Sequence, residues 1–65
     1  MEIKPRLMKI LKERGLTQDK LSEQSGVPQS AISRFDRSTQ HTDKHLFAIA
    51  RALNINVEEL FEVVE

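Results

Sequence analysis

Cysteine, tryptophan and tyrosine are absent from this 65-residue chain, which also has only two glycines and two prolines. Without cysteine, a disulfide framework and a thiolate zinc site are excluded. Apolar runs long enough to span a membrane are missing too, and the charged start of the chain is unlike a signal peptide. We therefore expect a cytoplasmic protein without a membrane partner. Its length limits it to one small domain, residues 1–65, with a marginal core.

An excess of charge of either sign is also lacking, because ten Lys and Arg residues balance ten Asp and Glu residues. Domains that bind nucleic acid are usually basic, so this balance at first argues against such a partner. The charges are unevenly spread, however. Residues 1–40 carry eight basic and five acidic side chains, a net of +3, whereas residues 41–65 carry two and five, a net of −3. This asymmetry indicates one basic working surface and an acidic remainder.

Turn and capping residues in the first half predict three short helices. Pro5 suits a first helical position and Gly15 a left-handed stop, so the first helix is expected between them. Thr17 is expected to cap a second helix that runs to about Ser25. A tight connection over residues 26–28 follows, and the third helix is expected from Pro28 to about Asp36.

The second half predicts two more helices after a polar loop over residues 37–42. Thr42 is the expected cap of the fourth helix, and Asn54 its expected end. Asn56 and Glu59 resemble a capping box for a fifth helix. Its apolar residues would be Val57, Leu60, Phe61 and Val64. The predicted fold class is therefore all-α, a compact bundle of five helices without a strand.

The third predicted helix has two sharply different faces. At helical spacing its buried side consists of Ala31, Ile32 and Phe35. Its polar side consists of Gln29, Ser30, Ser33, Arg34 and Arg37, with Asp36 near the edge. A merely solvated face is the alternative, but such faces are usually rich in Glu and Lys. Amide, hydroxyl and guanidinium groups are the ones that pair with base edges in DNA, so the pattern favours a DNA-reading helix.

The stretch GLTQDKLSEQSGVPQSAISRF, residues 15–35, resembles the helix-turn-helix of the phage repressor and Cro-like (XRE-type) DNA-binding family. Leu46–Phe61 resembles the fourth and fifth helices of the same family, so the resemblance runs from about Leu7 to Phe61. It implies a five-helix lambda-repressor-like domain, with the second and third helices as the helix-turn-helix. It also implies a bacterial or phage transcriptional regulator, a Cro-like repressor, that binds double-stranded DNA.

Matching the family pattern position by position implies two sets of site residues. The base-reading set is Gln29, Ser30, Ser33 and Arg34. The phosphate-binding set is Thr17, Gln18, Arg37, Thr39 and Gln40. The chain departs from the pattern at Ser38, where the family often has glycine, and at Leu11, where many members have an arginine that pairs with the acidic residue matched by Asp36. That carboxylate must then find Arg14, Lys12, a backbone amide or water.

Other kinds of site have less support. His41 and His45 have a spacing found in metal sites, but only Asp43 is near enough to be a third ligand, and a structural zinc ion needs four. Either histidine could touch a phosphate instead. No nucleophile stands at an informative spacing from a base, and no glycine-rich phosphate loop is present. We expect no enzyme activity, metal, cofactor or small-molecule ligand.

Apolar residues crowd the predicted last helical turn, namely Phe61, Val63 and Val64. They either fray or form a two-fold contact, and the small size of the core favours a homodimer. Such a dimer would address half-sites about 34 Å apart in a pseudo-palindromic operator. The alternative function is an adaptor or antitoxin-type interaction module that keeps the fold without reading DNA sequence. Bulky apolar or acidic residues would then be expected on the outside of the third helix.

Overall fold

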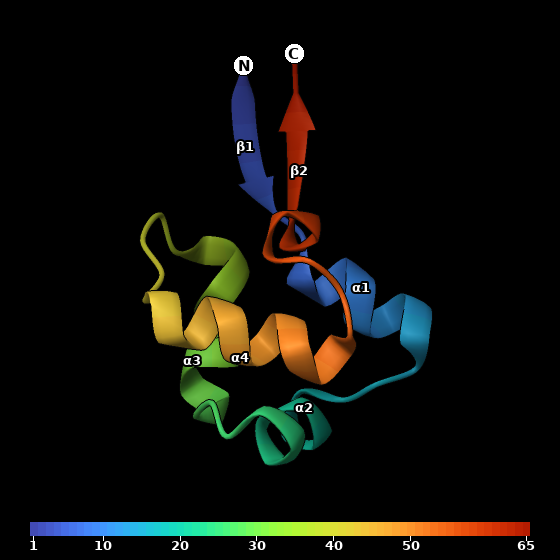
Figure 1. Ribbon diagram of the computed structural model, residues 1–65. Helices are drawn as coiled ribbons and strands as arrows, with labels where there is room; N and C mark the ends of the chain where they lie inside the picture. Colours follow the sequence, from blue (N-terminus) through green and yellow to red (C-terminus); the bar gives the residue numbers. More distant parts are fainter.

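Four α-helices surround a small apolar core, and a two-stranded antiparallel ribbon projects from them (Figure 1). The computed structural model describes residues 1–65. The helices are α1 (Leu7–Arg14), α2 (Gln18–Ser25), α3 (Gln29–Arg34) and α4 (Asp43–Leu53). Two 3-10 turns, η1 (Phe35–Arg37) and η2 (Val57–Leu60), and two strands, β1 (Glu2–Pro5) and β2 (Phe61–Val64), complete the chain. None of the helices has the length and apolar character needed to cross a membrane.

The helix ends predicted at Gly15, Thr17, Gly26, Thr42 and Asn54 are confirmed. Gly15 and Gly26 follow α1 and α2 in the left-handed conformation, with φ of 63° and 78°, which costs glycine little. Asn54 ends α4 in the same way, with φ of 59°. Thr17 and Thr42 each accept, through the side-chain oxygen, the amide of the residue three positions later. These local bonds satisfy helix-terminal N–H groups that would otherwise lack a partner.

Apolar residues from all four helices form one core. The buried members are Leu7, Ile10, Leu11, Leu21, Val27, Ile32, Phe35, Ile49, Ala50, Leu53 and Leu60. Arg14 fastens one side of this core, because its guanidinium donates to the carbonyl oxygen of Leu53 at 2.6 Å. The arginine thus joins the end of α1 to the end of α4, where the helix dipole favours a cation.

The prediction of a fifth helix, and with it the all-α class, is wrong. The amide of Asn56 does donate to the carboxylate of Glu59 at 2.7 Å, but the turn that follows is η2, a single 3-10 turn. From Phe61 onward the chain is extended and pairs with β1. The apolar positions 57, 60, 61 and 64 fit helical spacing, yet Val63 and Val64 are β-branched and favour a strand once a partner strand is available.

Two predicted helix boundaries are also wrong. Pro5 does not open α1 but ends β1, and α1 begins at Leu7. The α-helical part of α3 ends at Arg34, and the chain continues to Arg37 as the tighter turn η1. In the ribbon the opposed pairs are Glu2 with Val64, Ile3 with Val63, Lys4 with Glu62, and Pro5 with Phe61.

Aromatic packing fixes the base of the ribbon to the helical body. The ring of Phe61, at the start of β2, lies 5.9 Å from that of Phe35 and 5.7 Å from that of His41, between centroids. Phe35 is itself buried at the junction of α3 and η1. The ribbon therefore stands beside the end of α3.

Candidate nucleic-acid interface

The connection between α2 and α3 is held by two serines. The hydroxyl of Ser22 donates to the carbonyl oxygen of Val27 at 2.6 Å, and the oxygen of Ser25 accepts the amide of Val27 at 3.1 Å. Val27 itself is buried, and Gly26 supplies the left-handed residue. These bonds fix the direction in which α3 leaves α2. Sequence reasoning missed both serines, although hydroxyl residues just before a turn glycine commonly bond to the turn backbone.

The structure exposes all four residues of the expected base-reading set, Gln29, Ser30, Ser33 and Arg34. Of the predicted buried side, Ile32 in α3 and Phe35 at the start of η1 are buried, and Ala31 is half-buried. The hydroxyl of Ser33 donates to the carbonyl oxygen of Ser30 at 3.1 Å, which leaves its lone pairs free to accept from a base amino group. No acidic residue lies in α3.

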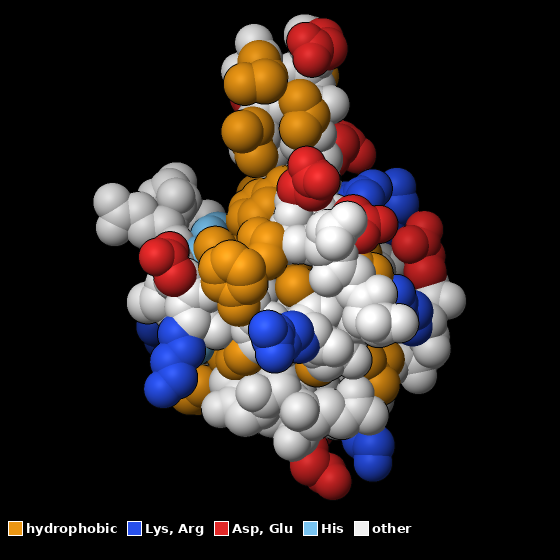
Figure 2. Space-filling model, in the orientation of Figure 1, with side chains coloured by type: hydrophobic (Ala, Val, Ile, Leu, Met, Phe, Trp, Pro, Cys, Tyr) orange, Lys and Arg blue, Asp and Glu red, His pale blue; other side chains and the backbone are white.

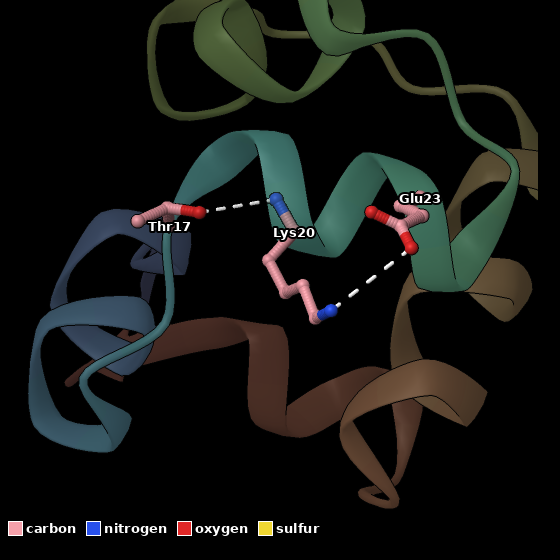
Figure 3. Close-up of polar contacts among 3 residues, drawn as sticks. All are labelled: Thr17, Lys20 and Glu23. Carbon is pink, nitrogen blue, oxygen red and sulfur yellow. Dashed lines mark hydrogen bonds and ion pairs between the residues drawn. The ribbon is translucent and has the colours of Figure 1, made fainter.

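Two residues of the expected phosphate-binding set lie at the start of α2. The oxygen of Thr17 accepts the amide of Lys20 at 3.1 Å, so its own hydroxyl proton remains free to donate (Figure 3). The half-buried Gln18 directs its amide nitrogen to the sulfur of Met8 at 3.2 Å. Sulfur is a weak acceptor, so a phosphate oxygen could replace this contact. Along the same helix the ammonium of Lys20 lies 3.9 Å from the carboxylate of Glu23 (Figure 3).

The other three residues of that set, Arg37, Thr39 and Gln40, are exposed at the end of η1 and in the loop that follows. Ser38 lies between them in an extended conformation, with φ of −86°. Its amide and its hydroxyl both donate to the carbonyl oxygen of Arg34, at 3.0 Å each. The serine thus closes the end of η1 with two hydrogen bonds, in a conformation that does not require glycine.

Asp36 has a backbone partner, one of the four possibilities open at the sequence level. Its two carboxylate oxygens accept the amides of Leu7 and Met8 at 2.8 and 3.0 Å. These amides begin α1, where Arg6 provides no side-chain cap. The carboxylate thus caps a helix distant in sequence and meets the positive end of its dipole. The carboxylate of Asp36, which follows α3 in the chain, is thereby bonded within the fold.

His41 is a packing residue in this structure. Its Nε2 lies 2.7 Å from the carbonyl oxygen of Phe35, and its ring lies 4.1 Å from the Phe35 ring, between centroids. His45 lies on α4 and is half-buried. The structure shows no group of three or more His, Asp or Glu side chains that could hold a metal ion.

The three residues of the expected dimer contact lie on β2, not on a helix. Because strand residues alternate between faces, Phe61 and Val63 share one face of the ribbon with Pro5 and Ile3. Val64 lies on the other face with Glu2 and Lys4. The structure therefore does not bring all three together in one patch.

Comparison with known proteins gives one finding. The helix-turn-helix family model matches residues 7–60, which include α1 to α4 and η2. Neither a curated protein nor a solved structure matches the chain significantly. The matched region spans most of the chain and contains the serine-braced turn and the exposed polar face of α3. The chain therefore belongs to the XRE-type helix-turn-helix family of DNA-binding regulatory domains.

Proposed function

We propose that this protein is a sequence-specific transcriptional repressor of the Cro type, which inserts α3 into the major groove of a pseudo-palindromic operator as a homodimer. The observation that carries the proposal is the outer face of α3. It presents an amide, two hydroxyls and a guanidinium to solvent over a buried apolar side, and it has no carboxylate. An adaptor that had lost DNA reading would be free to place acidic or bulky apolar groups there.

Each exposed group of α3 matches a base edge. Gln29 can pair with adenine through its amide, and Arg34 with the O6 and N7 atoms of guanine. Ser30 and Ser33 are less selective because a hydroxyl both donates and accepts. Gln29 begins the helix and Arg34 ends it, so the two selective side chains stand at opposite ends of the reading surface.

The phosphate contacts would flank α3 on both sides. Thr17 and Gln18 would bind on the α2 side, while Arg37, Thr39 and Gln40 would bind from the loop after η1. Such contacts position the protein without reading sequence. Asp36 supports them by joining η1 to α1, which fixes the segment that carries Arg37.

The experiment is a selection from a random double-stranded DNA library, followed by titration of the selected site and of scrambled DNA at two salt concentrations. We expect a pseudo-palindromic consensus whose half-sites lie about 34 Å apart, one turn of DNA. Occupied operators should reduce transcription from an overlapping promoter in a reporter assay. A library that yields no consensus would overturn the proposal and favour the interaction module.

A further inference from the structure

The ribbon of β1 and β2 exposes apolar side chains that the helices do not cover. Among the large apolar side chains, those exposed in and beside the ribbon are Met1 at 86%, Ile3 at 57%, Val63 at 54% and Val64 at 40%. The other exposed one is Phe47 on α4. In the space-filling view apolar atoms gather on one side of the projecting ribbon (Figure 2). A two-stranded ribbon with little covering is only marginally stable in water. An additional partner would stabilise it.

Hydrogen bonding determines which backbone groups this partner would meet. The amide of Arg6 donates to the carbonyl oxygen of Leu60 at 2.9 Å, in register with the ribbon. In an antiparallel pair, inward-pointing and outward-pointing residues alternate. Glu2 and Lys4 therefore point their backbone groups toward β2, whereas Ile3 points its N–H and C=O outward. Val63, opposite Ile3, points its N–H and C=O away from β1 in the same way. Each strand therefore has one edge whose backbone groups are unpaired within the ribbon.

The charges along β1 make its open edge complementary to itself. An antiparallel pair of two β1 strands can be centred on Glu2, Ile3 or Lys4. Centring on Glu2 opposes two carboxylates, and centring on Lys4 opposes two ammonium groups, which is unfavourable. Centring on Ile3 places each Glu2 opposite Lys4 of the other copy. The two side chains already attract each other within one strand, 3.4 Å apart.

The other open edge lacks this property. The charged residues of β2 and its extension, Glu62 and Glu65, are both acidic, and no basic residue lies among them. Pairing of β2 with a second β2 would therefore bring no opposite charges together across the axis, and Glu62 would have only Lys4 of its own chain beside it. The charge pattern thus distinguishes the β1 edge from the β2 edge.

A groove at the base of the ribbon provides room for the second copy. It has a volume of about 340 Å³ and is lined by Ile3, Pro5, Phe61 and the segment from Asp36 to Thr39, together with His41. In the pairing centred on Ile3, Met1 of the second copy lies opposite Pro5 on the face that borders this groove. The exposed Met1 side chain would then have an apolar surface to cover.

We propose that a second copy of the chain occupies this edge, with β1 paired to β1 about a two-fold axis at Ile3, giving a four-stranded sheet in the order β2–β1–β1–β2. The proposal rests on the proposed function and names the surface that joins the two DNA-binding units. Val63 flanks Ile3 in the apolar row of this sheet. Ile3 and Arg37 line the same groove, so the two-fold axis at Ile3 lies near the loop proposed to bind phosphate. The position of this axis would set the separation of the two α3 helices.

Charge reversal tests the pairing by sedimentation equilibrium over a wide concentration range. Lys4→Glu should raise the dimer dissociation constant at least tenfold because each Glu2 then faces a carboxylate. The triple variant Glu2→Lys/Lys4→Glu/Glu62→Lys should restore the wild-type constant, since the pairs across the axis and the pair of residues 4 and 62 within each chain are again complementary. The matched control is Glu62→Lys, which opposes Lys4 within one chain but lies away from the axis. It should leave the dimer unchanged.

Proline substitution tests the edge itself. Ile3→Pro removes an outward N–H at the centre of the proposed contact and should give a monomer. Val63→Pro removes the corresponding N–H of β2 and should leave the dimer intact. Circular dichroism of the monomeric variants should show unchanged helix content, which separates lost association from lost folding. The reverse result for the two prolines would assign the dimer to β2 and overturn the proposal.

The outcomes separate this inference from the function on which it rests. A wild-type chain that stays monomeric at every concentration but still selects a DNA consensus would overturn the β1 contact and leave the DNA-reading role standing. A dimer that responds to Lys4→Glu and Ile3→Pro as described, yet selects no consensus, would support the contact and overturn the function. Ile3→Pro that dimerises like the wild type would contradict the contact directly.

Discussion

At the scale of single residues, Asp36 has the role that is least visible in the sequence. It follows the buried Phe35 and precedes the exposed Arg37, where a carboxylate could repel DNA phosphates. The structure turns it inward to cap α1 through two amides. Its negative charge is thereby paired with the N-terminus of α1 and contributes to stability.

Asp36→Asn should lower the free energy of unfolding by about 1–2 kcal/mol, because one charge-assisted acceptor and the favourable charge at the dipole are lost. Urea denaturation measures this change. Asp43→Asn is the control, since Asp43 lies in the first turn of α4 and is exposed. It should cost at most about 0.5 kcal/mol. Equal losses of unfolding free energy in the two variants would show that the contacts of Asp36 with the two amides do not contribute to stability.

Arg34→Ala should weaken binding to the selected operator by about 1–3 kcal/mol and relax the base preference at one position of each half-site. The Arg34 side chain is exposed on the outer face of α3, where it is proposed to read a base. Competition titrations with single-base operator variants measure the preference. Arg51→Ala, the same change at an exposed site on α4, should leave it intact. An unchanged base preference in Arg34→Ala would contradict the assignment.

Arg37→Ala should weaken binding to all DNA sequences alike. Loss of one phosphate contact per chain should reduce the slope of log K against log salt concentration by about 0.9 for each copy bound. The measurement is a titration of operator and scrambled DNA at several salt concentrations. A loss confined to the operator would place Arg37 among the base-reading residues instead.

At the scale of elements, five helix ends were predicted correctly, each from a single residue and its near neighbours. Thr17, Thr42, Gly15, Gly26 and Asn54 act through bonds or backbone angles within their own turn, so a local pattern is sufficient to find them. The ribbon could not be found in this way, since β1 and β2 are joined from opposite ends of the chain. Local spacing favoured a helix for residues 57–64, and pairing with a distant strand overrode it.

In the candidate site, too, features decided by local spacing could be predicted, and contacts between distant residues could not. The exposure of Gln29, Ser30, Ser33 and Arg34 on α3 follows from helical spacing and could be predicted, whereas Arg37, predicted for the same helix, lies in η1. The partners of Asp36 and His41 could not, because Asp36 bonds to residues 28 and 29 positions away and His41 packs on two rings brought together only by the fold. The exposed edge of β1 was missed because no strand was predicted there.

The caps of α2 and α4 permit a matched comparison. Thr17→Ala and Thr42→Ala should each lower the free energy of unfolding by about 1 kcal/mol, measured by thermal or urea denaturation. Only Thr17→Ala should also weaken DNA binding when both variants are fully folded, because its hydroxyl is proposed to donate to a phosphate. Thr17→Ser should recover both properties. Equal DNA affinities of the two alanine variants would remove Thr17 from the phosphate-binding set.

At the scale of the whole molecule, the zero net charge is the sum of a basic first half and an acidic second half. The structure shows which of the basic residues already have a partner within the fold. Of the basic residues in the first half, Arg6 and Arg14 donate to the backbone carbonyls of Glu59 and Leu53. Lys4 and Lys20 lie beside carboxylates. Four of the eight basic residues of the first half are left without such a partner, namely Lys9, Lys12, Arg34 and Arg37. Only Arg34 and Arg37 among them belong to the proposed DNA contacts.

Binding to random-sequence DNA should consequently be weak, with a dissociation constant of about 10⁻⁴ M or above near 0.15 M salt, at the weak end of the usual range. Affinity for the operator should come mainly from base contacts and from the pairing of two chains. Fluorescence anisotropy with labelled scrambled duplexes measures the constant. Micromolar binding to such duplexes would show that the basic side chains act together more strongly than their partners within the fold allow.

The two amides that Asp36 accepts also provide a built-in reporter of motion. Amides in the first turn of a helix usually exchange freely with solvent deuterium because they lack a partner within the helix. Those of Leu7 and Met8 are bonded to a carboxylate from η1. Their exchange rates therefore report how often α1 separates from η1, the turn that follows α3. A slowing of these two amides when DNA is added would show that binding holds α1 and η1 together for a larger fraction of the time.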